Sequence, residues 1–374
     1  MKILHYTLGL PPYRSGGLTT YSYDLMIEQL KHNDDVYLLF PGRLRFINKE
    51  ASIKYYGMIS GVSVYELINP LPVPLMDGVN NGPEYRKEVD IDIYIEFLKK
   101  INVEIVHIHS FMGLHKEFLS AAKKLGISIV YTTHDYYGLC TKVNFLDKNG
   151  DVCKGRNIQK CLECNFHKND IKKIMILQSR IYRELKNQGV VEKIRGFTTK
   201  ISSLKKSQNT RAESNSIQRI FTKNEKQEYE KLLDYYDHMF SMIDRFIFNS
   251  SIARDVYNKT ISAKGDIVII THKNISDNRK IKNYDKKGLK LTYLGPDKEY
   301  KGYYLLDNVM RRLLLEGYKD IKLNIYGKTN AMGKVSENIY CNGPYSYDQL
   351  EDIFDNTDLL IVPSVWFETF GFIT

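Results

Sequence analysis

The sequence predicts an α/β protein with two Rossmann-like, doubly wound domains. Short apolar runs alternate with amphipathic stretches, which is the pattern of parallel sheets with crossover helices. The length of 374 residues exceeds what one ordinary core accommodates. A stretch rich in Lys, Asn and Asp at 273–288 separates two such blocks. We therefore expect an N-terminal domain over 1–275 and a partial C-terminal domain over 285–374, which stops before it is complete.

Each expected strand is a short apolar run, and the run at 359–362 is almost continuously apolar, as in parallel strands buried on both faces. The expected strands are 2–6, 36–40, 105–108, 128–132, 245–249, 267–270, 290–294, 321–326 and 359–362. Helical spacing of apolar positions marks the segments between them. The expected helices are 20–32, 115–125, 251–258, 304–316 and 347–356.

Composition excludes several classes of protein. Apolar residues make up 43% and charged residues 26%, which is normal for a soluble protein, and no apolar run approaches the roughly 20 residues that span a bilayer. The first residues resemble a buried strand, not a signal peptide, so we expect a cytoplasmic protein.

The net charge of +10 is concentrated in a basic helical insert at about 165–240. Two interpretations stay open: a solvated helical surface, or a surface that contacts anionic lipid headgroups at the inner face of the membrane. No DNA- or RNA-binding motif accompanies the charge, so nucleic acid is not an expected partner.

Three glycine-containing turns follow predicted strands. Gly16 and Gly17 precede the first helix, where free backbone N–H groups favour an anion, although a plain tight turn gives the same pattern. Lys301 follows the first strand of the second block and offers a point charge to a phosphate, or simply lies exposed.

The third turn is the most specific. It runs Pro-Ser-Val-Trp-Phe-Glu-Thr-Phe-Gly from 363 to 371. Glu368 would lie outside the carboxyl end of a buried strand, where open α/β sheets bind ligands, and Gly371 would open a helix. A carboxylate for sugar hydroxyls beside a helix N-terminus for pyrophosphate is what a nucleotide-sugar donor requires. The alternative is a carboxylate that stabilises its own helix dipole.

Taken together, these motifs resemble glycosyltransferase family 4. Further parts of the resemblance are the stretch 103–109 (Val-Glu-Ile-Val-His-Ile-His), the triplet Thr-His-Asp at 133–135 and the Ser-x-x-x-Arg-Asp segment at 250–255. The match covers nearly the whole chain except the basic insert. It implies a GT-B fold whose two domains face a cleft, with donor on the second domain and acceptor on the first. It also implies retention of anomeric configuration.

The resemblance assigns roles by position. Glu368 would bind the donor sugar and His134 would meet that sugar from the first domain; these are the implied catalytic residues. Lys301 and the backbone near Gly371 would hold the diphosphate. The implied donor-binding residues are Gly16, Gly17, Lys301, Asn342, Gly343, Tyr345, Ser364, Phe370, Gly371 and Phe372.

Two positions depart from the family pattern. Pro296 and Asp297 follow Gly295 where the family usually has an arginine, which removes one phosphate contact. The family's second glutamate would fall at 376, beyond Thr374. That residue binds the ribose, so we expect this chain to hold donor poorly.

Four cysteines lie within 25 residues, at 140, 153, 161 and 164. The final Cys-x-x-Cys suits a tetrahedral structural zinc site, and free thiols are the equal alternative. We expect no cofactor in catalysis, since the leaving diphosphate is stabilised by helix dipole and cations in enzymes of this kind.

The expected function is transfer of a sugar from an NDP-sugar, with UDP or GDP as the nucleotide, to a glycan or lipid-linked acceptor. The resemblance includes glycogen-synthase-like enzymes and those of capsule, O-antigen and lipopolysaccharide biosynthesis. Rival interpretations are another GT-B reaction, such as phosphorolysis or nucleotide-sugar epimerisation, and a non-catalytic sugar- or partner-binding fragment.

Overall fold

The computed structural model describes residues 1–45, 49–80, 82–166, 171–191, 219–269, 288–329, 332–369 and 371. It divides into two compact units. Unit 1 comprises Met1–Lys148 and Cys153–Asn274, and unit 2 comprises Asn149–Val152 and Ile275–Thr374. No helix in the described part of the chain has both the length and the hydropathy to cross a bilayer.

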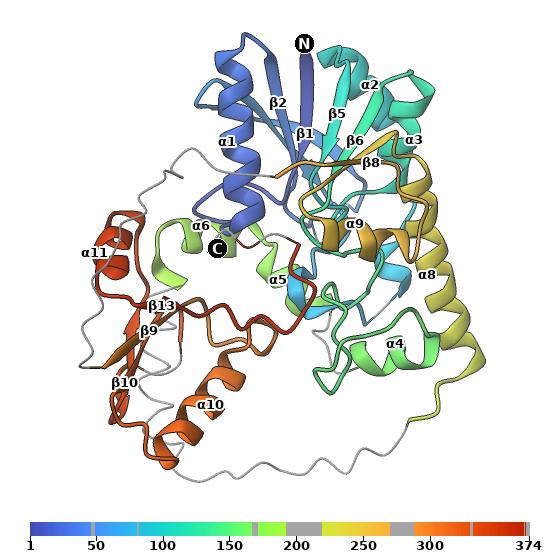
Figure 1. Ribbon diagram of the computed structural model, residues 1–374. Helices are drawn as coiled ribbons and strands as arrows, with labels where there is room; N and C mark the ends of the chain where they lie inside the picture. The colour runs from blue at the N-terminus through green and yellow to red at the C-terminus, as the bar shows by residue number, and fades with distance from the viewer. Residues whose placement is uncertain are drawn as a thin grey trace. The chain divides into compact units, whose positions relative to one another are not determined.

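Unit 1 is built on a sheet in the order β3-β4-β2-β1-β5-β6-β7-β8. Its strands are β1 (Lys2–Tyr6), β2 (Asp35–Pro41), β3 (Ser52–Ile59), β4 (Val62–Ile68), β5 (Ile105–Ile108), β6 (Ser128–Thr132), β7 (Arg245–Phe248) and β8 (Gly265–Ile267). Its helices are α1 (Gly17–Lys31), η1 (Leu75–Asp77), η2 (Gly82–Tyr85), α2 (Asp92–Ile101), α3 (Lys116–Lys124), α4 (Ile158–Asn165), α5 (Ile171–Leu177), α6 (Arg180–Asn187), α8 (Lys223–Ser241) and α9 (Ser251–Asn258). Figure 1 shows β1, β5 and β6 side by side within this sheet.

All neighbouring strands of unit 1 are parallel except the β3–β4 hairpin. The hairpin turns at Ser60 and Gly61, both with positive φ, which matches the twist of a two-residue turn. Strand order reverses at β1, which lies between β2 and β5. Ligands of open α/β sheets bind beyond the carboxyl ends of strands at such a point. We therefore expect a site of unit 1 in the loops after β1, β5 and β6.

Unit 2 repeats this plan on a smaller sheet in the order β11-β12-β10-β9-β13. Its strands are β9 (Leu289–Leu294), β10 (Ile321–Tyr326), β11 (Gly333–Ser336), β12 (Ile339–Gly343) and β13 (Leu359–Leu360). Its helices are η3 (Glu299–Lys301), α10 (Tyr303–Leu315), η4 (Tyr347–Gln349) and α11 (Leu350–Asp355). Only β11 runs antiparallel to its neighbour among these described pairs.

The core of unit 2 forms where alternate residues of β9 and β10 meet one face of α10. Leu291, Leu323 and Ile325 pack there against Leu306 and Met310. The strand order reverses at β9, which lies between β10 and β13. The loops that follow β9 and β13 carry Lys301 and Glu368, so the predicted donor residues lie beyond the carboxyl ends of these two strands.

The predicted fold class, α/β with two parallel-rich, Rossmann-like sheets, is confirmed. The expected strands 2–6, 105–108, 128–132 and 321–326 and the expected helix 251–258 have the bounds of β1, β5, β6, β10 and α9. The expected strand 359–362 is shorter, since β13 pairs with β9 only over Leu359 and Leu360. The expected strand 267–270 corresponds to β8, which lies nearer the N-terminus at Gly265–Ile267, and residue 270 lies outside the described part.

Candidate active site

A carboxylate with three donors lies at the carboxyl edge of the unit 2 sheet. Lys301 Nζ donates to Glu368 Oε1 at 3.0 Å and to Oε2 at 2.8 Å. Ser364 Oγ and Trp366 Nε1 donate to Oε2 at 2.9 and 3.0 Å. About a quarter of each side chain of the ion pair is exposed, 24% for Lys301 and 23% for Glu368. The carboxylate is thus held in a fixed orientation and still reaches solvent.

The backbone around this pair explains why it forms. Gly302 follows Lys301 with φ of 72°, the left-handed conformation that glycine adopts at no steric cost. A Cβ at this position would lie 1.8 Å from the carbonyl oxygen of Pro363. Val365 N also donates to Tyr300 O at 3.1 Å. The loop after β9 therefore packs directly on the loop after β13, and this contact places the lysine beside the glutamate.

Glycines continue the same edge toward β12. Gly327 N donates to Gly343 O at 2.8 Å, and Gly295 N donates to Tyr326 O at 2.8 Å. A Cβ on Gly327 would lie 2.1 Å from Gly295 O, so backbone is close to backbone here. Three strand intervals at about 4.8 Å put the end of β12 roughly 14 Å from the end of β13. This edge therefore runs from closely packed, buried backbone at Gly327 and Gly343 to the charged pair at the other end.

The predicted donor residues divide between the two ends of this edge. Ser364, Glu368 and Gly371 line one small pocket with Lys301. Gly343 is at the β12 end, where the ring of Tyr345 lies 6.5 Å from that of Tyr326. Asn342 is an exposed residue of β12. Phe370 and Phe372 lie outside the described residues.

The corresponding edge of unit 1 carries Gly16, Gly17 and His134. Gly16 has φ of 121° and precedes α1, which begins at Gly17. One turn into that helix, the ring of Tyr21 lies 5.1 Å from the ring of His134. The first turn of α1 and the loop after β6 are therefore neighbours, as the prediction that both belong to one rim requires.

His134 is the outer end of a chain of hydrogen-bonded imidazoles. Its Nε2 is 3.1 Å from His109 Nδ1, and His109 Nε2 is 3.0 Å from His5 Nδ1. His5 Nε2 is 2.7 Å from Gln29 Oε1, and Asn249 Nδ2 is 3.4 Å from His134 Nδ1. Because the Gln29 oxygen can only accept, His5 carries its proton on Nε2. His5 Nδ1 is then an acceptor, so His109 must donate to it from Nε2. For the same reason His134 donates from its Nε2 to His109 Nδ1.

Burial keeps these rings uncharged. It lowers the pKa of His5 to about 4 and the pKa of His134 to about 3. The pKa of His109 is also lowered well below its ordinary value, by burial first and then by the neighbouring histidines. Both nitrogens of His134 have partners within unit 1. A contact of either nitrogen with a ligand would exchange one of these bonds.

Sequence reasoning missed His5, Gln29 and Asn249. His107 and His109, the two histidines of the stretch 103–109, are both buried and hydrogen-bonded. The parallel register places His5 opposite His107, but only once the pairing of β1 with β5 is known. Asp135 is the last residue of the Thr-His-Asp triplet that is part of the motif resemblance. Both of its carboxylate oxygens accept hydrogen bonds, from Ser110 and Tyr137, and burial raises its pKa to about 6.

The four clustered cysteines, Cys140, Cys153, Cys161 and Cys164, are partly buried free thiols in the structure. The described residues that bring three ligand atoms within 4.8 Å of one another are His5, His107 and His109, not the cysteines. Tetrahedral zinc at about 2.3 Å from each sulfur would need the sulfurs roughly 4 Å apart. Burial raises the pKa of Cys140 to about 11, which favours a neutral thiol. Zinc at Cys140, Cys153, Cys161 and Cys164 stays a prediction for elemental analysis of the purified protein.

Comparisons with known proteins find similarity in structure alone. No family model matches the sequence, and no curated protein matches it. Among solved structures, the catalytic domain of starch synthase IV from Arabidopsis thaliana, bound to ADP and acarbose, is 10% identical, with 97% of this chain and 78% of that chain covered and a TM-score of 0.41.

Two further structures are similar at the same level. Anabaena HepE in complex with UDP is 8% identical, with 97% and 74% of the chains covered and a TM-score of 0.45. The lipopolysaccharide outer core galactosyltransferase WaaB is 12% identical, with the same coverage and a TM-score of 0.46. Such identities and TM-scores assign neither family nor activity to this chain.

Proposed function

We propose that this protein is a retaining glycosyltransferase of the GT-B fold. It would move a sugar from an NDP-sugar, with UDP or GDP as the nucleotide, to a glycan or a lipid-linked acceptor in surface polysaccharide biosynthesis. Membership of glycosyltransferase family 4 and retention of configuration are parts of this proposal and follow from the motif resemblance.

The arrangement of Lys301, Ser364 and Glu368 carries the proposal. A partly exposed carboxylate suits the hydroxyls of a sugar, and a lysine suits the phosphates of its leaving group. The lysine and the glutamate neutralise each other in their ion pair. A donor would replace this ion pair, with its diphosphate on Lys301 and its sugar on Glu368.

The side chains of unit 1 would then serve the acceptor. His134 is neutral, so it would contact the transferred sugar as a dipole or a packing surface and not as a cation. Asp135 is buried with both oxygens occupied, so it is not placed as a nucleophile. Attack on the same face that the diphosphate leaves, with the diphosphate assisting proton removal, is therefore the mechanism we propose.

We also propose contact with the inner face of a membrane. Two short helices in the described part of the basic insert support it. Ile176 on α5 and Ile181 on α6 are 60% and 72% exposed. The cations Lys172, Lys173 and Arg180 are exposed on the same helices. Apolar side chains interleaved with cations are the composition that binds anionic membrane surfaces.

A donor panel tests the activity. The full chain is incubated with UDP- and GDP-sugars, with and without candidate acceptors, and the products are analysed by NMR. We expect Glu368→Gln to lower turnover about a hundredfold. In this partly buried site a neutral amide accepts hydrogen bonds from sugar hydroxyls more weakly than a carboxylate does. Glu337→Gln, on an exposed carboxylate of the same unit, is the control and should change nothing.

The product distinguishes the rival functions. Conversion of the nucleotide sugar into an isomer would identify an epimerase. Nucleotide binding without release of sugar would identify a binding protein. Turnover that is unchanged in Glu368→Gln would refute the assignment of the donor site.

A further inference from the structure

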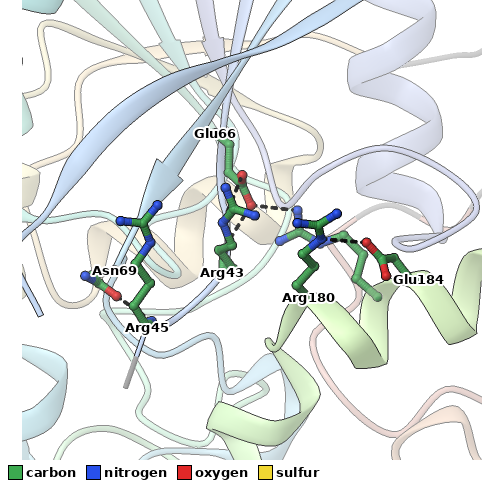
Figure 2. A network of polar contacts seen from close by, with 7 residues as sticks. Arg43, Arg45, Glu66, Asn69, Arg180 and Glu184 are labelled. Carbon is green, nitrogen blue, oxygen red and sulfur yellow. Dashed lines mark hydrogen bonds and ion pairs between the residues drawn. The ribbon is translucent and has the colours of Figure 1, made fainter. Parts of the chain in front are cut away.

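Two arginines of unit 1 meet at a single buried carboxylate, and a third arginine shares an aromatic ring with one of them. Arg183 lies on α6 and Glu66 on β4, with 7% and 5% of each residue exposed. Arg183 Nη1 is 2.8 Å from Glu66 Oε1. Arg43, in the segment after β2, lies with its Nε 3.8 Å from Glu66 Oε2, and its backbone N–H donates to Glu66 Oε1 at 3.0 Å. Figure 2 shows Arg43 beside Glu66, with the Arg180–Glu184 pair next to them.

The third arginine, Arg14, comes from the loop after β1. Its guanidinium lies 4.5 Å from the centre of the Tyr13 ring, and that of Arg183 lies 5.0 Å from the same centre. Burial lowers the pKa of Arg14, and the positive charge of Arg183 lowers it further. Cation–π contact with Tyr13 offsets part of the repulsion between these two arginines but brings no negative charge.

The charges in this group do not balance. Among the described ion pairs of Arg14, Arg43 and Arg183, Glu66 is the one carboxylate. Three guanidinium groups and one carboxylate leave an excess of two positive charges. Several buried donors also lack a hydrogen-bond partner: Nε of Arg14, and Nε and Nη2 of Arg183, while Nε of Arg43 makes only the 3.8 Å ion pair with Glu66. Buried donors and charges are normally paired.

The group lies at the same edge of the sheet as His134. Arg14 and Arg43 follow the carboxyl ends of β1 and β2. Glu66 is in register with Phe40, near the end of β2. These loops flank the point where the strand order reverses, which is the ligand-binding edge of such a sheet.

We propose that Arg14, Arg43 and Arg183 form a phosphate-binding site, and that this site takes a phosphate group carried by the acceptor. The excess of two charges matches a phosphate dianion better than a carboxylate. Guanidinium groups bind phosphate oxygens through paired N–H donors. Glu66 orients Arg43 and Arg183 and leaves their remaining N–H groups for the ligand. That the acceptor is the molecule carrying the phosphate rests on the proposed function, whereas phosphate binding by these arginines does not.

Binding of inorganic phosphate to the full chain tests the site directly. Titration calorimetry is run without a donor on the wild type and on Arg14→Gln, Arg43→Gln and Arg180→Gln. We expect the first two variants to bind phosphate about tenfold more weakly, since each loses a charge-assisted hydrogen bond. Arg180→Gln, next to the cluster but paired with Glu184, should bind as the wild type does. Melting curves establish that each variant is folded.

Two further variants establish which unit binds the phosphate. Lys301→Met leaves the arginine cluster intact, so loss of phosphate binding in that variant would place the ligand in unit 2 and overturn the proposal. Glu66→Gln removes the competing carboxylate and should tighten phosphate binding if it folds. A purely structural arginine cluster predicts the same affinity in Arg14→Gln and Arg43→Gln as in the wild type, and that result would refute the site.

The source of the phosphate is resolved with vesicles. Binding to phosphatidylcholine vesicles that contain phosphatidic acid, lost in Arg14→Gln and Arg43→Gln, would identify a lipid-borne phosphate. Binding of inorganic phosphate without any such vesicle binding would identify a soluble phosphorylated acceptor. Failure to bind phosphate in either form would refute the inference even if sugar transfer is observed.

Discussion

The buried histidines of unit 1 should make that unit sensitive to mild acid. His5 and His115 are both buried, and burial lowers their pKa values to about 4 and about 3. In the unfolded chain a histidine titrates near 6.5. Below that pH these histidines are protonated in the unfolded chain and stay neutral in the folded protein. The free energy of unfolding therefore has its full value above about pH 6.5. It decreases progressively as the pH falls toward the pKa values of the folded protein.

The size of the effect follows from these values. At about pH 5 each unfolded histidine is protonated and each of these folded ones is neutral, which costs about 2 kcal/mol per residue. Asp135 acts in the opposite direction: burial raises its pKa to about 6, so its folded form takes up a proton first and returns about 1 kcal/mol. His5, His115 and Asp135 together give a net loss of about 3 kcal/mol, and the lowered pKa values of His107, His109 and His134 add to it.

The chain contains its own control. All nine histidines of the sequence precede Ile275, so unit 2 has none, and the single tryptophan, Trp366, belongs to unit 2. Urea unfolding is followed at about pH 7.5 and about pH 5 by tryptophan fluorescence for unit 2 and by circular dichroism for the larger unit 1. We expect the unit 1 transition to shift toward lower urea and the tryptophan transition to shift less.

A single substitution isolates the contribution of one histidine to this loss of stability. His115 Nδ1 is 2.7 Å from the hydroxyl of Tyr94, and His115→Gln removes the titrating ring but keeps a polar group. We expect this variant to lose about 2 kcal/mol of the pH dependence. His238→Gln, on an exposed histidine, should keep all of it. A unit 1 transition that is the same at both pH values, or an undiminished pH dependence in His115→Gln, would refute the reasoning.

Two other predictions concern backbone and surface. Gly302→Ala should destabilise unit 2 by about 2 kcal/mol more than Gly317→Ala, measured by urea unfolding. Both glycines have positive φ, but only a Cβ on Gly302 meets Pro363 O; equal losses would show that the loop contact is unimportant. Ile181→Asp should weaken sedimentation with phosphatidylglycerol vesicles, because it removes a largely exposed apolar side chain next to cations. Asp266→Asn, on an exposed residue of β8, is the control, and unchanged sedimentation of Ile181→Asp would argue against membrane contact through α6.

The sequence was informative where strands are apolar and turns contain glycine. Residues 105–108 and 321–326 were predicted as strands because each is a short apolar, strand-like run between amphipathic stretches. The hairpin of β3 and β4 was missed. Glu66 gives β4 a polar position, and this residue is buried only because Arg183, 117 positions along the chain, reaches it. A pairing over such a separation leaves no local pattern.

The same distinction holds for the candidate site. Lys301, Ser364 and Glu368 follow strands in recognisable turns, and the structure brings them together. The arginine cluster could not be predicted, since Arg14, Arg43 and Arg183 belong to three separate segments with no shared motif. Nothing in their local sequence distinguishes them from the many exposed cations of a chain with net charge +10.

The contact between Gly302 and the Pro363 carbonyl has a consequence for how this protein can diversify. The two loops behind the Lys301–Glu368 pair are braced against each other through bare backbone, so an insertion in either loop would separate the pair. Variants with altered sugar preference should therefore change side chains within fixed loop lengths. Val365 is such a position. Its backbone N–H makes the bond to Tyr300, so a different side chain there would leave the contact between the two loops in place.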